Sequence, residues 1–252
     1  MLHRESVSEK VEIITLRWPE KRNSLAPEDA REVAKAITDA SAAADCVVLT
    51  GDGAFCSGGD LRRFAEISAS VDHATLRDHV YGDIQAMMRS IEASPVPVIA
   101  AVDGAAVGLG LDLALACDMC FVGPDGWLQQ GWGRAGLIAG TGGIAFLQRL
   151  HPRLIWRMLA EQERLSAERC AELGLAEMGK PTAREAAICR AEQLAAIGRD
   201  VLSTYTVLAR AQTWPDTAHM RHSAESQARY IGSTQFRELA ARILSGQRRP
   251  TS

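Results

Sequence analysis

Residues 101–118 read AVDGAAVGLGLDLALACD. The segment just before and into this stretch, VIAAV at 98–102, is continuously apolar, as in a strand buried on both faces. The glycines at 104, 108 and 110 then indicate a turn, and the apolar residues after them continue as a helix that carries Asp112. A buried strand, a glycine turn and a helix in succession predict an α/β fold.

An earlier segment has the same design. The strand predicted at 46–50, CVVLT, leads through the loop GDGAFCSGG at 51–59 into a short helix from Asp60 to about Ile67. The first N–H groups of a helix have no partner inside the helix, so each loop can aim a backbone N–H at one oxygen. Two such loops predict an oxyanion hole for an enolate or a tetrahedral intermediate. Neither loop matches the glycine patterns of ATP or dinucleotide sites.

The rest of the chain extends the α/β pattern and then becomes helical. The other predicted elements are a strand at 11–16, helices at 27–43 and 74–93, strands at 119–122 and 127–129, and a helix from about 140 to 150. From Arg153 onward only helices are expected, among them 200–212, 216–230 and 233–245, followed by a solvated tail at 247–252. No internal repeat is visible, so the pattern indicates an α/β core with a helical C-terminal section.

Composition excludes several classes of protein. Of 252 residues, 47% are hydrophobic and 23% charged, and the net charge of −3 argues against a basic nucleic-acid binder. The charged start, Met1 to Glu5, predicts a cytoplasmic protein with reduced cysteines. Cys117 and Cys120 have CxxC spacing but no second pair, so we interpret them as buried thiols, not zinc ligands. The apolar run 104–122 contains two aspartates, which indicates a core segment and not a membrane span.

Three motifs in order resemble the crotonase (enoyl-CoA hydratase/isomerase) superfamily: FCSGGDL at 55–61, the stretch at 101–118, and GLIAGTGG at 136–143. The resemblance runs from about Val11 to Leu175. It implies an α/β crotonase-type spiral of ββα units with a helical C-terminal section. It further implies a single domain over 1–252, with a spiral core to about 195 and a trimerisation or lid section from about 196.

The resemblance also implies partners. The substrate would be an acyl thioester of coenzyme A or of an acyl carrier protein, with coenzyme A as part of the substrate and no separate cofactor or metal. The chain would form a homotrimer or a dimer of trimers, without nucleic-acid or membrane partners.

The resemblance also implies roles for individual residues of this sequence. The oxyanion-hole amides of the family fall on Gly59 and Leu109, where many members have glycine at the second position. The residues expected near the coenzyme A nucleotide are Lys21, Arg22, Asp60 and Arg62. Asp60 equally fits a helix N-cap, and the three cations equally fit a solvated surface.

The catalytic carboxylates depart from the hydratase pattern. Similar hydratases use two glutamates around one water; here the first position is Asp112 and the second is Trp132. Indole offers no basic nitrogen to handle protons. Trp132 fits either core packing or a lid on the acyl pocket, where it would be a substrate-binding residue. Gly140 stands where dehalogenases and dienoyl-CoA isomerases of the family keep an aspartate. Double-bond isomerisation with Asp112 as the only carboxylate base is therefore favoured.

The sequence is compatible with other reactions and with another class of protein. Asp112 alone could support hydration, and decarboxylation or thioester hydrolysis needs no second glutamate. A protein of another class would bind acyl-CoA or a partner without turnover, with Trp132 plugging the water site.

Burial in an apolar run should raise the pKa of Asp112 toward neutrality, although a structural, hydrogen-bonded aspartate is the alternative. His79, near Tyr81, could face the acyl pocket, and His219 and His222 lie one helical turn apart. For these histidines an exposed surface position is favoured.

Overall fold

The fold is described from a computed structural model covering residues 1–246. Its main sheet has six strands in the order β1-β2-β3-β4-β6-β9. The strands are β1 (Leu2–Ser8), β2 (Val11–Leu16), β3 (Cys46–Gly51), β4 (Val98–Val102), β6 (Met119–Val122) and β9 (Glu177–Met178). Only β1 pairs antiparallel to its neighbour; the other four pairs are parallel. Parallel strands require crossovers, and the helices between them supply these.

A second, three-stranded sheet lies beside the first, in the order β5-β7-β8. It consists of β5 (Ala105–Val107), β7 (Trp127–Gln129) and β8 (Leu165–Ser166). Strand β5 falls inside the segment predicted as a pure glycine turn, so that prediction was incomplete. The glycines at 104 and 108 flank these three residues and favoured a turn. Strands β8 and β9 interrupt the segment after Arg153 that was predicted to be wholly helical, because two residues each are too few to show an alternating pattern.

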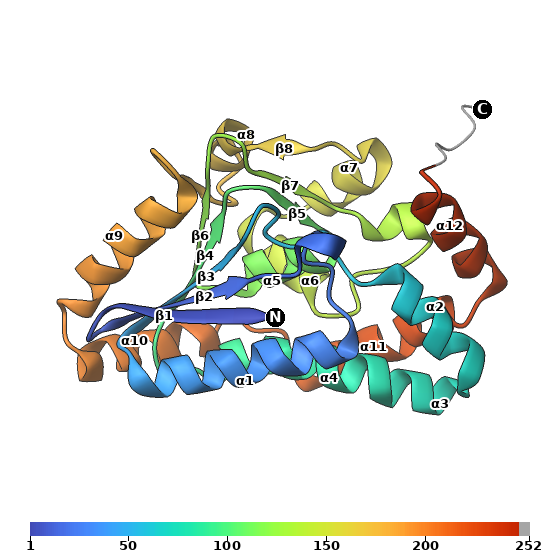
Figure 1. Cartoon of the computed structure of the whole chain (residues 1–252), viewed down its shortest axis with the longest axis horizontal. Helices are drawn as coiled ribbons and strands as arrows, with labels where there is room; N and C mark the ends of the chain where they lie inside the picture. The colour runs from blue at the N-terminus through green and yellow to red at the C-terminus, as the bar shows by residue number, and fades with distance from the viewer. Residues whose placement is uncertain (247–252) are drawn as a thin grey trace.

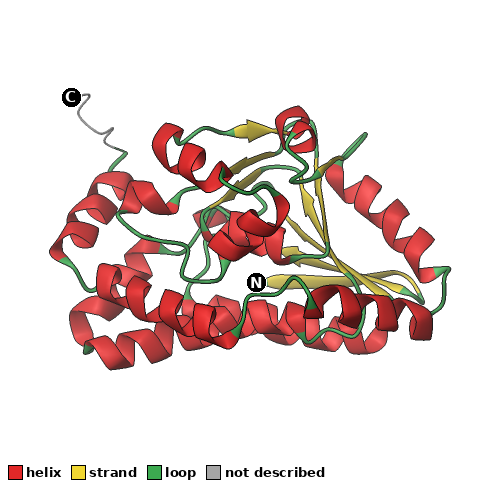
Figure 2. Ribbon diagram, turned by 180° about the vertical axis from the view of Figure 1, so that it is seen from behind, coloured by secondary structure: helices red, strands yellow, loops and turns green. Residues whose placement is uncertain are grey.

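Helices cover both faces of the main sheet (Figures 1 and 2). In the first part of the chain they are η1 (Pro19–Lys21), α1 (Pro27–Ala43), α2 (Leu61–Ser70), α3 (His73–Leu76), η2 (Arg77–Tyr81), α4 (Gly82–Glu92) and α5 (Leu109–Ala116). The later ones are η3 (Trp132–Ala135), α6 (Gly143–Leu150), α7 (Leu154–Glu161), α8 (Ala167–Glu172), α9 (Ala183–Ala195), α10 (Arg199–Ala211), α11 (Thr217–Ile231) and α12 (Thr234–Leu244). The single helix predicted at 74–93 is α3 and α4 joined by η2, a π-helical turn.

Helix α9 lies flat on one face of the sheet. Four alanines at intervals of four residues, from Ala183 to Ala195, are buried against Ile13, Val48 and Ile99 in the smaller of two apolar clusters. The spacing places them on one helix face, and their small side chains bring the helix backbone close to the strands. The opposite face carries the larger cluster, which includes α1, α4 and α5.

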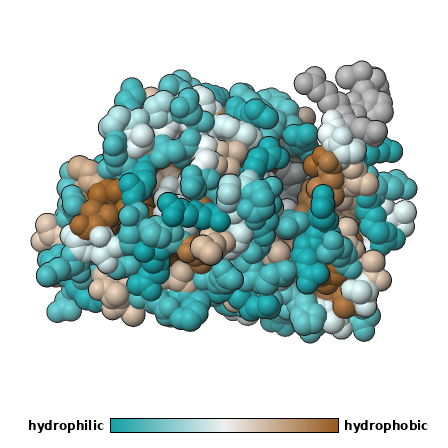
Figure 3. All heavy atoms as spheres, in the orientation of Figure 1, coloured by the Kyte–Doolittle hydropathy of each residue, from teal (hydrophilic) through white to brown (hydrophobic). Residues whose placement is uncertain are grey.

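The interpretation of Cys117 and Cys120 as buried thiols is confirmed. Both are free and buried, and burial raises the pKa of each above its usual value. Within residues 1–246, no helix is both long and apolar enough to cross a membrane. In the view of Figure 3 the surface is mainly hydrophilic, with small separate apolar patches, one of them near α12. The predicted solvated tail at 247–252 lies outside the described residues.

Candidate active site

The two glycine loops predicted from the sequence meet in space. The loop after β3 pairs with β5, since the N–H of Cys56 donates to the Ala105 carbonyl and the N–H of Val107 donates to the Cys56 carbonyl, both at 3.0 Å. Gly58 has φ +120°, and a β-carbon there would lie 3.1 Å from the Val107 oxygen. The close approach of the two loops therefore requires glycine at this position.

The backbone hydrogen bonds of the loop after β3 leave the Gly59 N–H without an acceptor. Leu25 bonds to the residues on either side of it, through Gly58 O and the Asp60 N–H, each at 2.9 Å. The Gly59 peptide consequently faces the other way, into a pocket that also takes in the first residue of α5, Leu109. In the described part of the chain, neither the Gly59 N–H nor the Leu109 N–H donates a hydrogen bond. Both amides are available to a ligand oxygen.

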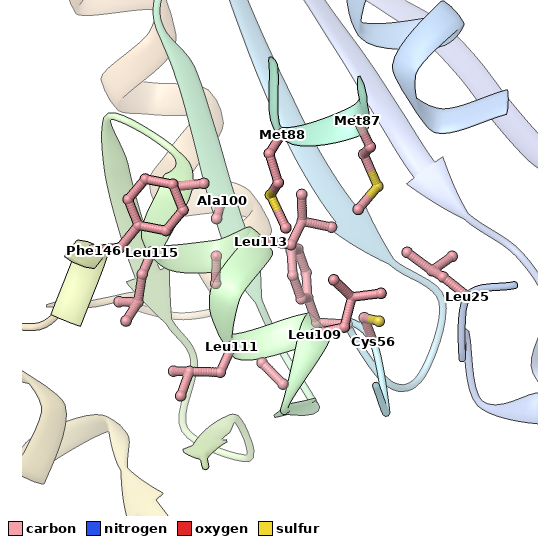
Figure 4. Packing of buried hydrophobic residues seen from close by; sticks show 14 of the residues in the cluster. Leu25, Cys56, Met87, Met88, Ala100, Leu109, Leu111, Leu113, Leu115 and Phe146 are labelled. Atoms are coloured by element: carbon pink, nitrogen blue, oxygen red, sulfur yellow. The ribbon is translucent and has the colours of Figure 1, made fainter. Parts of the chain in front are cut away.

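The Leu109 side chain does not occupy this pocket. It is fully buried, and Figure 4 shows it in the apolar core beside Cys56 and Leu113. The departure from glycine at this position therefore leaves the amide free without filling the space next to it. The pocket has a volume of about 330 Å³.

Asp112 lies one helical turn beyond Leu109 and is 2% exposed. One of its oxygens, Oδ2, accepts two hydrogen bonds, from Thr141 Oγ1 at 2.6 Å and from Trp132 Nε1 at 2.9 Å. Burial raises the pKa of Asp112 to about 7, against the lowering effect of these two bonds. The expected rise in pKa is confirmed, and the hydrogen bonding that was its structural alternative is also present.

Trp132 stands between Asp112 and the pocket. Its side chain is 3% exposed and lines the pocket, whereas Asp112 and Thr141 do not. The indole ring lies against Gly108, where a β-carbon would sit 3.6 Å from two ring carbons. On the far side of Asp112, a β-carbon on Gly143 would lie 1.9 Å from Oδ1. Glycine at 143 therefore makes room for the carboxyl group, and Trp132 separates it from the pocket.

Three arginines line the same pocket, Arg22, Arg134 and Arg164. All three are exposed, and no carboxylate of residues 1–246 lies within ion-pair distance of them or lines the pocket with them. Arg164 lies over the ring of Trp127, 4.3 Å from its centre. Arg134 and Arg164 were not predicted, because they come from separate elements and nothing in the sequence links them. Thr141 was visible only as part of a glycine-rich motif.

The other residues expected near the coenzyme A nucleotide do not line the pocket, and two of them contact other parts of the protein. Lys21 pairs with Asp29 and lies 5.4 Å from the centre of the Trp18 ring. Asp60 caps α2 by accepting from the Arg63 N–H at 3.1 Å. Neither lines the pocket, and neither does the exposed Arg62. Of the predicted group, the structure places only Arg22 in the pocket.

The histidines lie away from this pocket. His79 and His222 are exposed, and His219 is half-buried. None of the three lines the pocket. His73 lies 2.8 Å from a carboxylate oxygen of Glu225.

Comparison with known proteins identifies the family and the fold. A sequence profile described as enoyl-CoA hydratase/isomerase matches residues 6–239. A protein of Mycobacterium tuberculosis named as a probable enoyl-CoA hydratase is 32% identical over 253 residues, covering 97% of this chain and 96% of that protein. The chain is thus similar to it over nearly the full length of both.

Solved structures show the same fold. An enoyl-CoA hydratase/isomerase from Mycobacterium paratuberculosis superposes with a TM-score of 0.85 at 24% identity, covering 96% of this chain and 97% of that one. An enoyl-CoA hydratase from Polaromonas sp. JS666 gives a TM-score of 0.77 at 30% identity, covering 98% and 97%. The predicted crotonase-type α/β fold with a helical C-terminal section is confirmed. The chain belongs to the enoyl-CoA hydratase/isomerase family.

Proposed function

We propose that the protein acts on acyl thioesters of coenzyme A and holds the thioester oxygen between the N–H groups of Gly59 and Leu109. The observation that carries this proposal is that two loops, far apart in sequence, present two unpaired amides to one pocket. Donors already aimed at the place where negative charge develops stabilise an enolate at little reorganisation cost. Coenzyme A as the carrier is supported by the three arginines at the pocket, because its phosphates need cationic partners.

The proposed reaction is the shift of a double bond in a 3-enoyl thioester to the 2-position. The Asp112 carboxylate takes a proton from the α-carbon, the electron pair moves to the thioester oxygen, and the two amides hold the enolate. Asp112 then returns the proton at the γ-carbon. A pKa near 7 suits a group that must both accept and give a proton at neutral pH. Hydration by two carboxylates is not supported, since the second position carries Trp132.

A binding protein without turnover is the second candidate. It is favoured by one observation: Asp112 does not line the pocket, and Trp132 covers it. In that function the pocket would take the thioester and no proton would move.

The test compares wild type, Asp112→Asn and the matched control Asp125→Asn, which changes an exposed aspartate that does not line the pocket. Each is incubated with 3-enoyl- and 2-enoyl-CoA panels, followed by thioester absorbance and chromatographic separation of the isomers. We expect isomerisation by wild type and the control, and its loss in Asp112→Asn with acyl-CoA affinity retained. Binding without conversion in wild type would favour the second candidate, and equal rates in all three proteins would remove Asp112 from the mechanism.

We also propose that the chain assembles with copies of itself, as a homotrimer or a dimer of trimers. Helix α10 supports this, because it exposes Val201, Tyr205 and Leu208 on one face by 50%, 70% and 63%. Apolar side chains at spacings of four and three residues form a continuous stripe, which is costly to leave in water.

A further inference from the structure

Asp112 and the proposed oxyanion hole occupy opposite sides of one side chain. The indole of Trp132 lies against Gly108, directly before Leu109, and its Nε1 donates to Asp112 Oδ2. The carboxyl group therefore does not line the pocket, whereas the ring that bonds to it does. A base behind this ring cannot touch a substrate carbon.

The second hydrogen bond to Asp112 comes from the protein interior. Thr141, fully buried, donates to the same Oδ2 and does not line the pocket. If the indole moves away, Thr141 still holds the carboxyl group in place, and the acceptor site that Trp132 vacates faces the pocket. The two donors thus have different consequences: one anchors the carboxylate and the other covers it.

The residues on either side of Trp132 in the chain have no side chains. Gly131 and Gly133 flank it, and η3 ends at Gly136 in the left-handed region with φ +70°. The short 3₁₀ turn is held by few bonds, including Leu137 N–H to Trp132 O at 2.9 Å and Gly136 N–H to Gly133 O at 3.2 Å. A short turn of this kind can shift without disturbing a sheet or a long helix.

We propose that Trp132 is a positioning and specificity-determining residue that covers Asp112 until an acyl group displaces the indole. Coenzyme A alone binds at the arginines and leaves the ring in place. A thioester whose acyl chain reaches past Gly59 and Leu109 breaks the Trp132–Asp112 hydrogen bond and exposes the carboxylate. This inference rests on the proposed function, because it places an acyl thioester in the pocket.

The hydrogen bond itself gives a direct readout. The chain has five tryptophans, so ¹H–¹⁵N spectra should contain five indole N–H signals, of which Trp132 is assigned by its loss in Trp132→Phe. Trp127, which also lines the pocket, reports occupancy. With medium-chain acyl-CoA we expect the Trp132 signal to move upfield, since it loses a carboxylate acceptor, and the Trp127 signal to shift. With coenzyme A, only Trp127 should shift.

Two contrary results are distinguishable. If acyl-CoA shifts Trp127 and leaves the Trp132 signal unchanged, the displacement is wrong while the proposed binding function stands. If acyl-CoA shifts neither signal and calorimetry detects no binding, the proposed function fails and the displacement fails with it.

A second test needs no ligand and measures whether Trp132 shields the Asp112 carboxyl group from a reagent. Carbodiimide with an amine nucleophile modifies accessible carboxyl groups, and mass spectrometry locates the product. We expect Asp112 to stay unmodified in wild type and to be modified in Trp132→Ala, with exposed Asp125 modified in both as the control. A folded Trp132→Ala variant with an unmodified Asp112 would show that another group seals the carboxylate.

Trp132→Phe keeps an aromatic ring, although a smaller one, and removes the N–H, so it serves where the alanine variant does not fold. Its ring has no hydrogen bond to break, and acyl-CoA should bind several-fold more tightly relative to coenzyme A than in wild type. An unchanged or smaller ratio would contradict the proposal.

Discussion

At the scale of single residues, Asp112 shows how burial and hydrogen bonding oppose each other. Loss of hydration disfavours the charged carboxylate, while Thr141 and Trp132 favour it, and the first effect is the larger. The result is a carboxyl group that titrates near neutral pH.

This shift predicts a specific pH dependence of stability. Between its unfolded pKa of 3.8 and its folded pKa of about 7, Asp112 holds a proton in the folded protein that the unfolded chain has released. The stabilisation is complete below the lower value and decreases as the pH rises to the upper one, by roughly 1.4 kcal/mol per pH unit. Asp112→Asn lacks this titration, so the free energy of unfolding of wild type relative to the variant should fall across that range and level off above it.

Urea unfolding of both proteins, at equal protein concentration and several pH values, measures the difference. Other carboxylates titrate in both proteins and cancel. Two parallel stability curves would mean that Asp112 ionises normally in the folded state.

The sequence predicted the burial of Asp112 and the direction of its pKa shift, because a carboxylate stood inside an apolar helix. It could not predict that Trp132 donates to that carboxylate. The two residues are 20 positions apart, and their contact depends on how η3 packs against α5. Core packing, one of the two roles expected for Trp132, is confirmed, because the residue is 3% exposed and belongs to the larger apolar cluster; a lid on the acyl pocket stays a prediction.

At the scale of elements, many segments occur with the predicted bounds, including the short strands β6 (Met119–Val122) and β7 (Trp127–Gln129). Helix α1 (Pro27–Ala43) and strand β2 (Val11–Leu16) have the predicted bounds. Strand β5 was missed, yet it is the element that holds the two loops together through Cys56. Strand β5 lies between Gly104 and Gly108, which favoured a turn, and its pairing with β7 is a tertiary feature that the local sequence does not reveal.

The exposed apolar stripe of helix α10 leads to a testable prediction about assembly. If its exposed stripe is buried between copies of the chain, the double variant Tyr205→Glu with Leu208→Glu should dissociate the assembly, because each charge would have to lose its hydration at the interface. Light scattering after size-exclusion chromatography measures the mass of the particle. The control is Gln193→Glu, an exposed position on α9. Wild type running at 27.2 kDa, the mass of one chain, would contradict the assembly itself.

At the scale of the whole molecule, charge is unevenly distributed. The chain has a net charge of −3, yet the pocket is lined by three arginines and by no carboxylate of the described residues. The arginines come from the loop after η1, from η3 and from the segment before β8, so only the complete fold brings them together. An anionic ligand is therefore attracted to this pocket by a local field opposite in sign to the net charge.

Removing two of these charges should weaken coenzyme A binding through its phosphates. We expect Arg134→Ala with Arg164→Ala to lower acyl-CoA affinity by about tenfold or more, since a charge-assisted hydrogen bond contributes roughly 1.5–3 kcal/mol. The variant should also show a smaller loss of affinity with added salt than wild type. Arg190→Ala, which removes an arginine paired with Glu177 outside the pocket, is the matched control. Calorimetry with acyl-CoA and with the same acyl group on N-acetylcysteamine, which has no phosphate, separates the causes. An equal loss for both ligands would mean that the arginines contact the acyl group or support the pocket, and not the phosphates.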